Sequence, residues 1–198
     1  MLGPGSDVAA AGSVRPMKPP FPPQRTAPVV QGDGIVLCAL EPRDTPAMLE
    51  NDRDSETAAR FGWDPGAAAL WRCEAAIERA ADLWRTGEGL TFAVREASGG
   101  PLLGIVDAQM REHPPGAETG DRAVELSWTT MPGARGRGTA TRAVRAMVSF
   151  AGTLGFAEVW AKVDRDNPAS LAVARAAGFR EVSGDVRRVV LSASTGSG

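Results

Sequence analysis

The run Arg135-Gly136-Arg137-Gly138-Thr139-Ala140 carries the strongest chemical pattern in the chain. It follows an expected strand and opens an expected helix over residues 139–154. The first amides of a helix have no intrahelical acceptor, and they lie at the positive end of the helix dipole. Glycines allow a ligand to approach the backbone closely, and the arginines add positive charge. The segment therefore predicts a site for an anion such as a pyrophosphate.

Two common nucleotide-binding loops do not fit this segment. It lacks the Gly-Lys-Ser/Thr ending of a nucleoside triphosphate loop, and it lacks the third glycine of a dinucleotide-binding loop. Taken alone, the segment is also compatible with an ordinary glycine-rich turn between a strand and a helix.

The elements around this segment are those of a mixed α/β domain. Hydrophobic periodicity and turn residues predict helices that begin at Thr45 and Asn167 and helices over residues 67–85 and 139–154. The expected strands cover residues 35–40, 91–95, 102–111, 122–130 and 158–163, with a closing hairpin over 179–182 and 186–191.

The two ends of the chain differ in composition from the middle. Residues 1–33 are rich in proline and glycine and show no apolar periodicity, which predicts a disordered leader. Residues 34–192 are expected to form a single domain, and residues 193–198 a flexible tail of small residues.

Composition limits the class of protein. The 198 residues carry 22 basic and 24 acidic side chains, a near-balance that argues against a dedicated nucleic-acid binder. No apolar run approaches the roughly 18–20 residues that span a bilayer, and no secretory signal is visible. The two cysteines have no metal-ligand spacing. We therefore expect a cytoplasmic protein without a membrane partner or a metal.

The order of motifs in the second half of the chain resembles the GNAT superfamily of acyl-CoA-dependent N-acyltransferases. The resemblance rests on the loop from Arg135 to Ala140, the following helix and strand, Asn167-Pro168-Ala169-Ser170 and Gly178-Phe179. The run from Asp164 to Ser170 is especially similar to the ribosomal-protein alanine N-acetyltransferase branch. The close match covers residues 125–181 and is specific for the superfamily rather than for a substrate.

The resemblance implies a fold and a co-substrate. The fold is a mixed, mostly antiparallel sheet that splays near its middle, flanked by helices on both faces, and acetyl-CoA lies in the splay. The pantetheine arm is expected along the strand and the pyrophosphate at the amides of residues 136–140. The cofactor-binding residues implied are Thr129, Thr130, Met131, Arg135, Gly136, Arg137, Gly138, Thr139, Ala140 and Asn167.

The reaction implied is acetyl transfer from the thioester to a primary amine by direct attack in a ternary complex. An α-amino group has a pKa of ~7.7–8.0, so about a tenth of it is neutral at neutral pH. A lysine side chain, with a pKa of ~10.4, is neutral only about once in 2,500. A site without a strong base therefore favours a protein N-terminus or another weakly basic amine.

Two residues are candidates for catalysis, each with a structural alternative. Many members of the superfamily use a tyrosine as the acid, but the matching position is Ala174 and the chain has no tyrosine. The resemblance suggests Ser170 as a hydrogen-bond donor to the leaving sulfur, although it also fits a plain first-turn serine. Glu125 could accept the amine proton, directly or through water, or be an ordinary strand glutamate.

Other polar and aromatic residues have simpler roles. Asn167 before proline is fully explained as a helix N-cap, which is compatible with a contact to CoA. Trp63, Trp71 and Trp84 lie where the superfamily builds its acceptor pocket, but Trp71 and Trp84 fit the helix period and are expected in the core. His113 is expected to be a solvated loop residue.

Three alternatives to a protein N-acetyltransferase stay open at this point. The missing tyrosine suggests a non-catalytic acyl-CoA-binding module. The same fold could serve a small-molecule N-acetyltransferase for an antibiotic or a polyamine. The arginines of the loop and helix (Arg135, Arg137, Arg142 and Arg145) could bind an anion or a nucleic acid, although the overall charge does not favour this. A homodimer is compatible with the sequence.

Overall fold

The structure is a computed structural model that describes residues 19–110 and 123–196. Its strands are β1 (Val30–Gly32), β2 (Ile35–Cys38), β3 (Gly89–Arg95), β4 (Gly104–Met110), β5 (Ala123–Thr130), β6 (Glu158–Asp164), β7 (Arg180–Gly184) and β8 (Arg188–Ser194). Its α-helices are α1 (Thr45–Arg53), α2 (Ser55–Phe61), α3 (Leu70–Thr86), α4 (Thr139–Thr153) and α5 (Pro168–Ala176). Short 3-10 helices cover Pro42–Asp44, Pro65–Ala67 and Pro132–Ala134.

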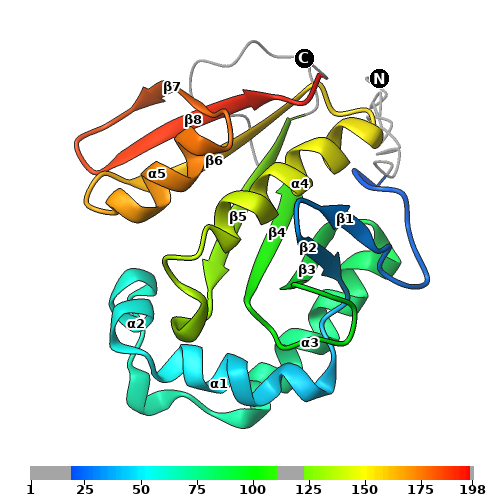
Figure 1. The fold of residues 1–198 in the computed structure, drawn as a ribbon, viewed down its shortest axis with the longest axis vertical. Helices are drawn as coiled ribbons and strands as arrows, with labels where there is room; N and C mark the ends of the chain where they lie inside the picture. The colour runs from blue at the N-terminus through cyan, green and yellow to red at the C-terminus, as the bar shows by residue number, and fades with distance from the viewer. Residues whose placement is uncertain (1–18, 111–122, 197–198) are drawn as a thin grey trace, which may run out of the picture.

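The strands form one 8-stranded sheet in the order β1-β2-β3-β4-β5-β6-β8-β7 (Figure 1). Neighbouring strands are antiparallel except β5 and β6, which pair in parallel. The crossover between these parallel strands is α4, as a parallel pair requires. The predicted fold, a mixed and mostly antiparallel sheet, is confirmed.

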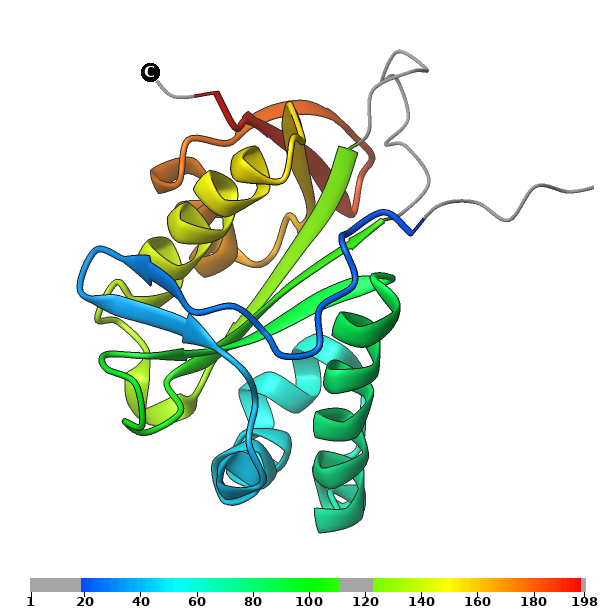
Figure 2. The ribbon, with the colours of Figure 1, turned by 90° about the vertical axis from the view of Figure 1, so that its right-hand side faces the viewer.

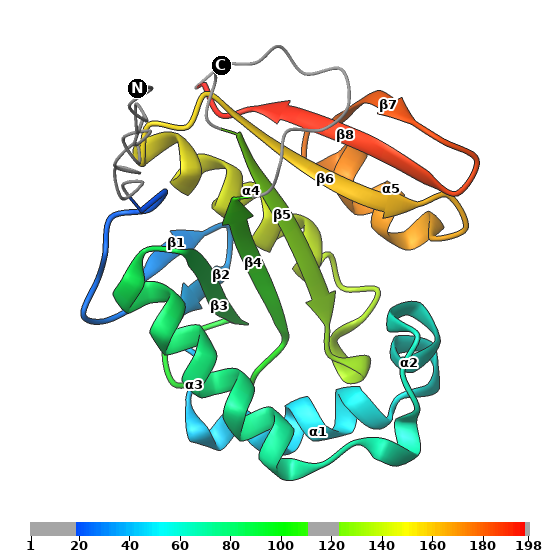
Figure 3. The same ribbon diagram turned by 180° about the vertical axis from the view of Figure 1, so that it is seen from behind.

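Helices cover both faces of the sheet. α4 and α5 lie on the face seen in Figure 1, and α1 and α3 lie on the opposite face (Figure 3). Figure 2, turned by a quarter, shows α3 and α4 on either side of the sheet. In the described ranges, 19–110 and 123–196, no helix is both long and apolar enough to cross a membrane.

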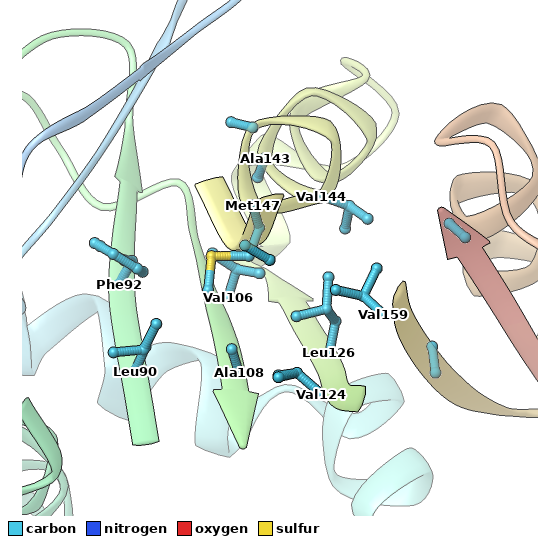
Figure 4. Close-up of a cluster of buried hydrophobic side chains, with 14 of the residues drawn as sticks. Leu90, Phe92, Val106, Ala108, Val124, Leu126, Ala143, Val144, Met147 and Val159 are labelled. Carbon is cyan, nitrogen blue, oxygen red and sulfur yellow. The ribbon is translucent and has the colours of Figure 1, made fainter. Parts of the chain in front are cut away.

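The main core lies between α4 and the central strands (Figure 4). Ala143, Val144 and Met147 share one face of α4, because residues three and four apart lie on the same side of a helix. They pack on side chains such as Phe92 and Val106, which point to the same face of the sheet. This packing fixes α4 on the central strands of the sheet.

A buried ion pair anchors the start of α1 to the sheet. The Nη2 atom of Arg95 on β3 lies 2.6 Å from Oδ2 of Asp44, and both side chains are almost fully buried. The Nε–H group of Arg95 also donates to the sulfur of Cys38 on β2. Because buried charges are costly unless paired, these contacts lock the relative positions of α1, β2 and β3.

The domain extends further at both ends than the sequence analysis predicted. Phe21 is 1% exposed and packs on Phe156, and its amide donates to the carbonyl of Gly87. β1 pairs with β2, so residues 19–33 belong to the domain rather than to a disordered leader. β8 likewise continues to Ser194, past the expected boundary at residue 192. A single aromatic residue such as Phe21 produces no hydrophobic periodicity, so the sequence pattern did not predict that this segment is buried.

Candidate active site

The sheet opens between β5 and β6. These strands pair only from Ala123 to Glu125, opposite Glu158 to Trp160, and then diverge (Figures 1 and 3). From Leu126 to Thr130, β5 has only β4 as a paired neighbour. Backbone groups of β5 that are directed toward β6 therefore lack a strand partner and are available to a ligand.

A cavity of about 670 Å³ occupies this opening. Its walls come from β4, β5 and β6, from α2, and from the first turns of α4 and α5. Segments far apart in the sequence thus converge on one space. The volume is within the usual range of ~300–1,000 Å³ for ligand pockets.

The turn before α4 borders this cavity. Gly136 and Gly138 have φ angles of 73° and 72°, in the left-handed region that favours glycine. Gly138 is the N-cap residue, and both glycines line the cavity together with Thr139 and Ala140. The free amides of the first helical turn consequently border the cavity, as an anion site requires.

Arg135 ties this turn to α2. Its guanidinium lies 2.5 Å from Oδ1 of Asp54 and 3.1 Å from Oε2 of Glu56, and it donates to the hydroxyl of Thr57. The hydrogen bond from Arg135 is the main reason that the pKa of Asp54 falls to about 2. Arg135 lines the cavity, but its charge is largely neutralised by α2, which the sequence analysis did not anticipate.

Two of the residues predicted to bind CoA, Met131 and Arg137, do not line the cavity. Thr129 and Thr130 line the cavity. Met131 is buried in the core, and its amide already donates to the carbonyl of Leu103. Arg137 is exposed and lies outside the set of residues that line the cavity.

The start of α5 forms the opposite wall. Asn167 is the N-cap of α5, and its Oδ1 atom accepts from the amide of Ser170 at 3.0 Å. Both residues line the cavity. The cap uses the backbone of Ser170, so its hydroxyl is not needed for it. Ala174, one turn further on, is fully buried.

The two carboxylates near the closed end of the opening have different surroundings. Glu125, the predicted proton acceptor, is half-buried at the last paired position of β5, and it is not among the residues that line the cavity. Asp107 on β4, which the sequence analysis missed, does line it. An acidic residue within the otherwise mostly apolar strand 102–111 was the signal available.

Aromatic residues lie at the α2 side of the cavity. Phe61 lines it and stacks on Trp63, with ring centroids 4.7 Å apart. Trp84 is buried, as predicted. The prediction that Trp71 belongs to the core is wrong, because it lies in the first turns of α3 and is 66% exposed. His113 lies outside the described residues.

Taken together, the cavity combines an amide-rich anion site, an open strand edge, a hydroxyl and a carboxylate. Such an arrangement can hold an extended ligand that carries a pyrophosphate, and it presents acid–base groups near the other end. Within residues 19–110 and 123–196, no three His, Cys, Asp or Glu side chains come together as a metal site.

Comparison with protein families defines the class of protein. Residues 35–180 match the family model described as an acetyltransferase (GNAT) domain, which is most of the chain. The chain therefore belongs to the GNAT acetyltransferase family. The predicted class, an N-acetyltransferase with acetyl-CoA as co-substrate, is confirmed at the level of the family. Among curated proteins, a sequence search finds no match.

Solved structures share the fold at low sequence identity. Mycobacterium smegmatis RimJ in complex with CoA-disulfide has a TM-score of 0.69 and 19% identity, over 90% of each chain. The microcin C7 self-immunity acetyltransferase MccE, in complex with acetyl-CoA and AMP, has a TM-score of 0.67 and 15% identity, over 82% of this chain and 93% of that one. Spermidine N-acetyltransferase from Vibrio cholerae, with CoA and spermine, has a TM-score of 0.62 and 17% identity, over 82% and 96%.

Proposed function

We propose that this protein transfers the acetyl group of acetyl-CoA to a primary amine, with both substrates bound at once. The observation that carries the proposal is the continuity of one cavity. It runs from the amides at the start of α4, along the open edge of β5, to Ser127 and Asp107 near the closed end of the opening. One end suits the pyrophosphate, and the other leaves room for an acceptor next to the thioester.

In the proposed complex, the pyrophosphate binds the amides of residues 136–140. The pantetheine arm extends along β5 beside Thr129 and Thr130, in the stretch of β5 that has no strand partner on the side of β6. We do not expect the amide of Met131 to take part, because Leu103 already accepts its hydrogen bond. Asn167 and Ser170 contact the arm from α5.

The amine nitrogen attacks the thioester carbonyl carbon after losing a proton, and the carbon–sulfur bond then breaks. A backbone amide of β5 polarises the carbonyl oxygen. The hydroxyl of Ser170 donates a hydrogen bond to the sulfur as it leaves. Glu125, the predicted proton acceptor, lies outside the cavity lining, so it makes no direct contact with the amine. Positioning of the two substrates supplies much of the rate enhancement.

Within primary amines, we propose a protein N-terminal α-amine as the acceptor. The resemblance of the run from Asp164 to Ser170 to the ribosomal-protein alanine N-acetyltransferase branch supports this choice. RimJ and spermidine N-acetyltransferase are both among the structural neighbours, so a small amine is the competing acceptor class.

Calorimetric titration with acetyl-CoA and steady-state turnover test the proposal. Release of CoA thiol is measured with a peptide that has a free N-terminal alanine, with spermidine and with an aminoglycoside. Intersecting double-reciprocal lines support a ternary complex, whereas parallel lines indicate an acetyl-enzyme and contradict direct attack. Tight binding of acetyl-CoA without turnover of any amine would favour the non-catalytic binding module instead.

A further inference from the structure

The carboxyl group of Asp107 occupies an unusual position in the cavity. Register places Asp107 on β4 between Thr91 on β3 and Ser127 on β5. The hydroxyl of Thr91 donates to Oδ1 at 2.6 Å, and the hydroxyl of Ser127 approaches Oδ2 at 3.5 Å. The three side chains form a polar row on the face of the sheet opposite α4. Asp107 and Ser127 line the cavity.

Asp107 differs from the other acids that line the cavity. Glu56 pairs with Arg135 at 3.1 Å, and Asp164 pairs with Arg188 at 2.8 Å. Asp107 forms no ion pair within the described part of the chain, and burial raises its pKa in spite of the two hydroxyl groups. A shielded carboxylate without a cation is costly, so its presence in a cavity points to a cationic ligand.

Asp107 lies near the place where the thioester of bound acetyl-CoA is expected. The pyrophosphate site lies beyond Thr130, at the open end of β5, so an extended pantetheine arm brings the thioester toward the closed end. That end is marked by Glu125, the last residue of β5 paired with β6. Ser127 lies just inside it, and Asp107 is directly opposite Ser127 on the next strand.

We propose that Asp107 binds the acceptor amine of the enzyme. Its carboxylate binds the ammonium form of the acceptor and takes a proton from the ammonium nitrogen. This inference rests on the proposed function and specifies its substrate class, an amine that arrives as a cation. The proton moves from nitrogen to the carboxylate, the nitrogen forms a bond to the carbonyl carbon, and the carbon–sulfur bond breaks. The thiolate takes a proton from the attacking nitrogen, and Asp107 releases its own to solvent.

The Asp107→Asn variant keeps the shape and most hydrogen bonds but removes the charge. We expect kcat/KM for the alanine peptide and for spermidine to fall about 10- to 100-fold, the loss of one charge-assisted hydrogen bond. Turnover of aniline, which is uncharged at neutral pH, should change less than threefold. The melting temperature should stay equal or rise, because a desolvated charge is gone. Asp82→Asn, an exposed residue of α3 paired with Arg85, is the control and should behave as the parent.

The outcomes separate this inference from the proposed function. Ordinary turnover with unchanged kinetics in Asp107→Asn would overturn the role of Asp107 and leave the function intact. An equal loss for charged and uncharged amines, together with a lower melting temperature, would show a structural role and also overturn it. If the parent protein turns over no amine, the proposed function fails, and calorimetric titration of spermidine into the CoA complex then tests Asp107 separately. Loss of spermidine binding in Asp107→Asn would support the acceptor site. Equal binding by the parent and Asp107→Asn would overturn it.

Discussion

Gly138 offers the most direct test of the CoA-binding turn. Its φ of 72° is strained for any residue with a β-carbon, and a β-carbon built there meets no other atom within 4 Å. The protein itself therefore has room for a side chain at this position. We expect Gly138→Val to weaken CoA binding in two ways, by straining the backbone and by filling space that the ligand occupies. Gly138 lines the cavity at the N-cap of α4.

The expected magnitudes follow from these two effects. A non-glycine residue in the left-handed region costs about 1–2 kcal/mol, which for a chain of this size lowers the melting temperature by roughly 2–8 °C. Tilting the first helical amides removes one or two charge-assisted hydrogen bonds of roughly 1.5–3 kcal/mol each. At ~1.4 kcal/mol per decade, acetyl-CoA should bind from about tenfold more weakly, if one weak bond is lost, to about ten-thousand-fold more weakly, if two strong bonds are lost.

Calorimetric titration measures the affinity, and circular dichroism checks the fold. Gly133→Val is the matched control, because Gly133 is exposed, has no positive φ and lies outside the cavity lining. It should keep the affinity of the parent. A folded Gly138→Val protein that binds acetyl-CoA as tightly as the parent would refute the assignment of the pyrophosphate to this turn.

Three further predictions concern other parts of the molecule. Ser170→Ala should keep both its helix cap and its CoA affinity but lower turnover at least about tenfold, and unchanged turnover would leave the hydroxyl without a role. Phe21→Ala should cost about 3–5 kcal/mol of unfolding free energy in urea denaturation, and a near-zero loss would mean that the N-terminal segment does not dock. Because its folded pKa of about 2 lies below the unfolded value, Asp54 stabilises the protein above about pH 4, and this contribution is lost as the pH falls toward 2. Arg135→Gln should raise the pKa of Asp54 in an NMR titration and cost about 1 kcal/mol or less, since the pair is partly exposed, and an unmoved pKa would contradict the pairing.

The order of elements and the anion-binding turn were predictable from the sequence. Hydrophobic periodicity predicted α4, an apolar run predicted β6, and Asn167-Pro168 predicted the start of α5. Each of these signals depends on residues that are close together in the chain. The predicted boundaries differ from the structure by a few residues in most elements. The exceptions are α2, which was not predicted, and residues 19–33 and Trp71, where burial is decided by contacts with distant parts of the chain.

The sequence by itself determined the class of protein, because the turn from Arg135 to Ala140 and the cap of α5 are local motifs whose backbone chemistry does not depend on the rest of the fold. Only the tertiary structure decided which side chains share the cavity. Strand register places Asp107 beside Ser127, and the packing of α2 pairs Arg135 with Asp54. These contacts join residues that the sequence separates by tens of positions, and a pairing of that kind leaves no local pattern to read.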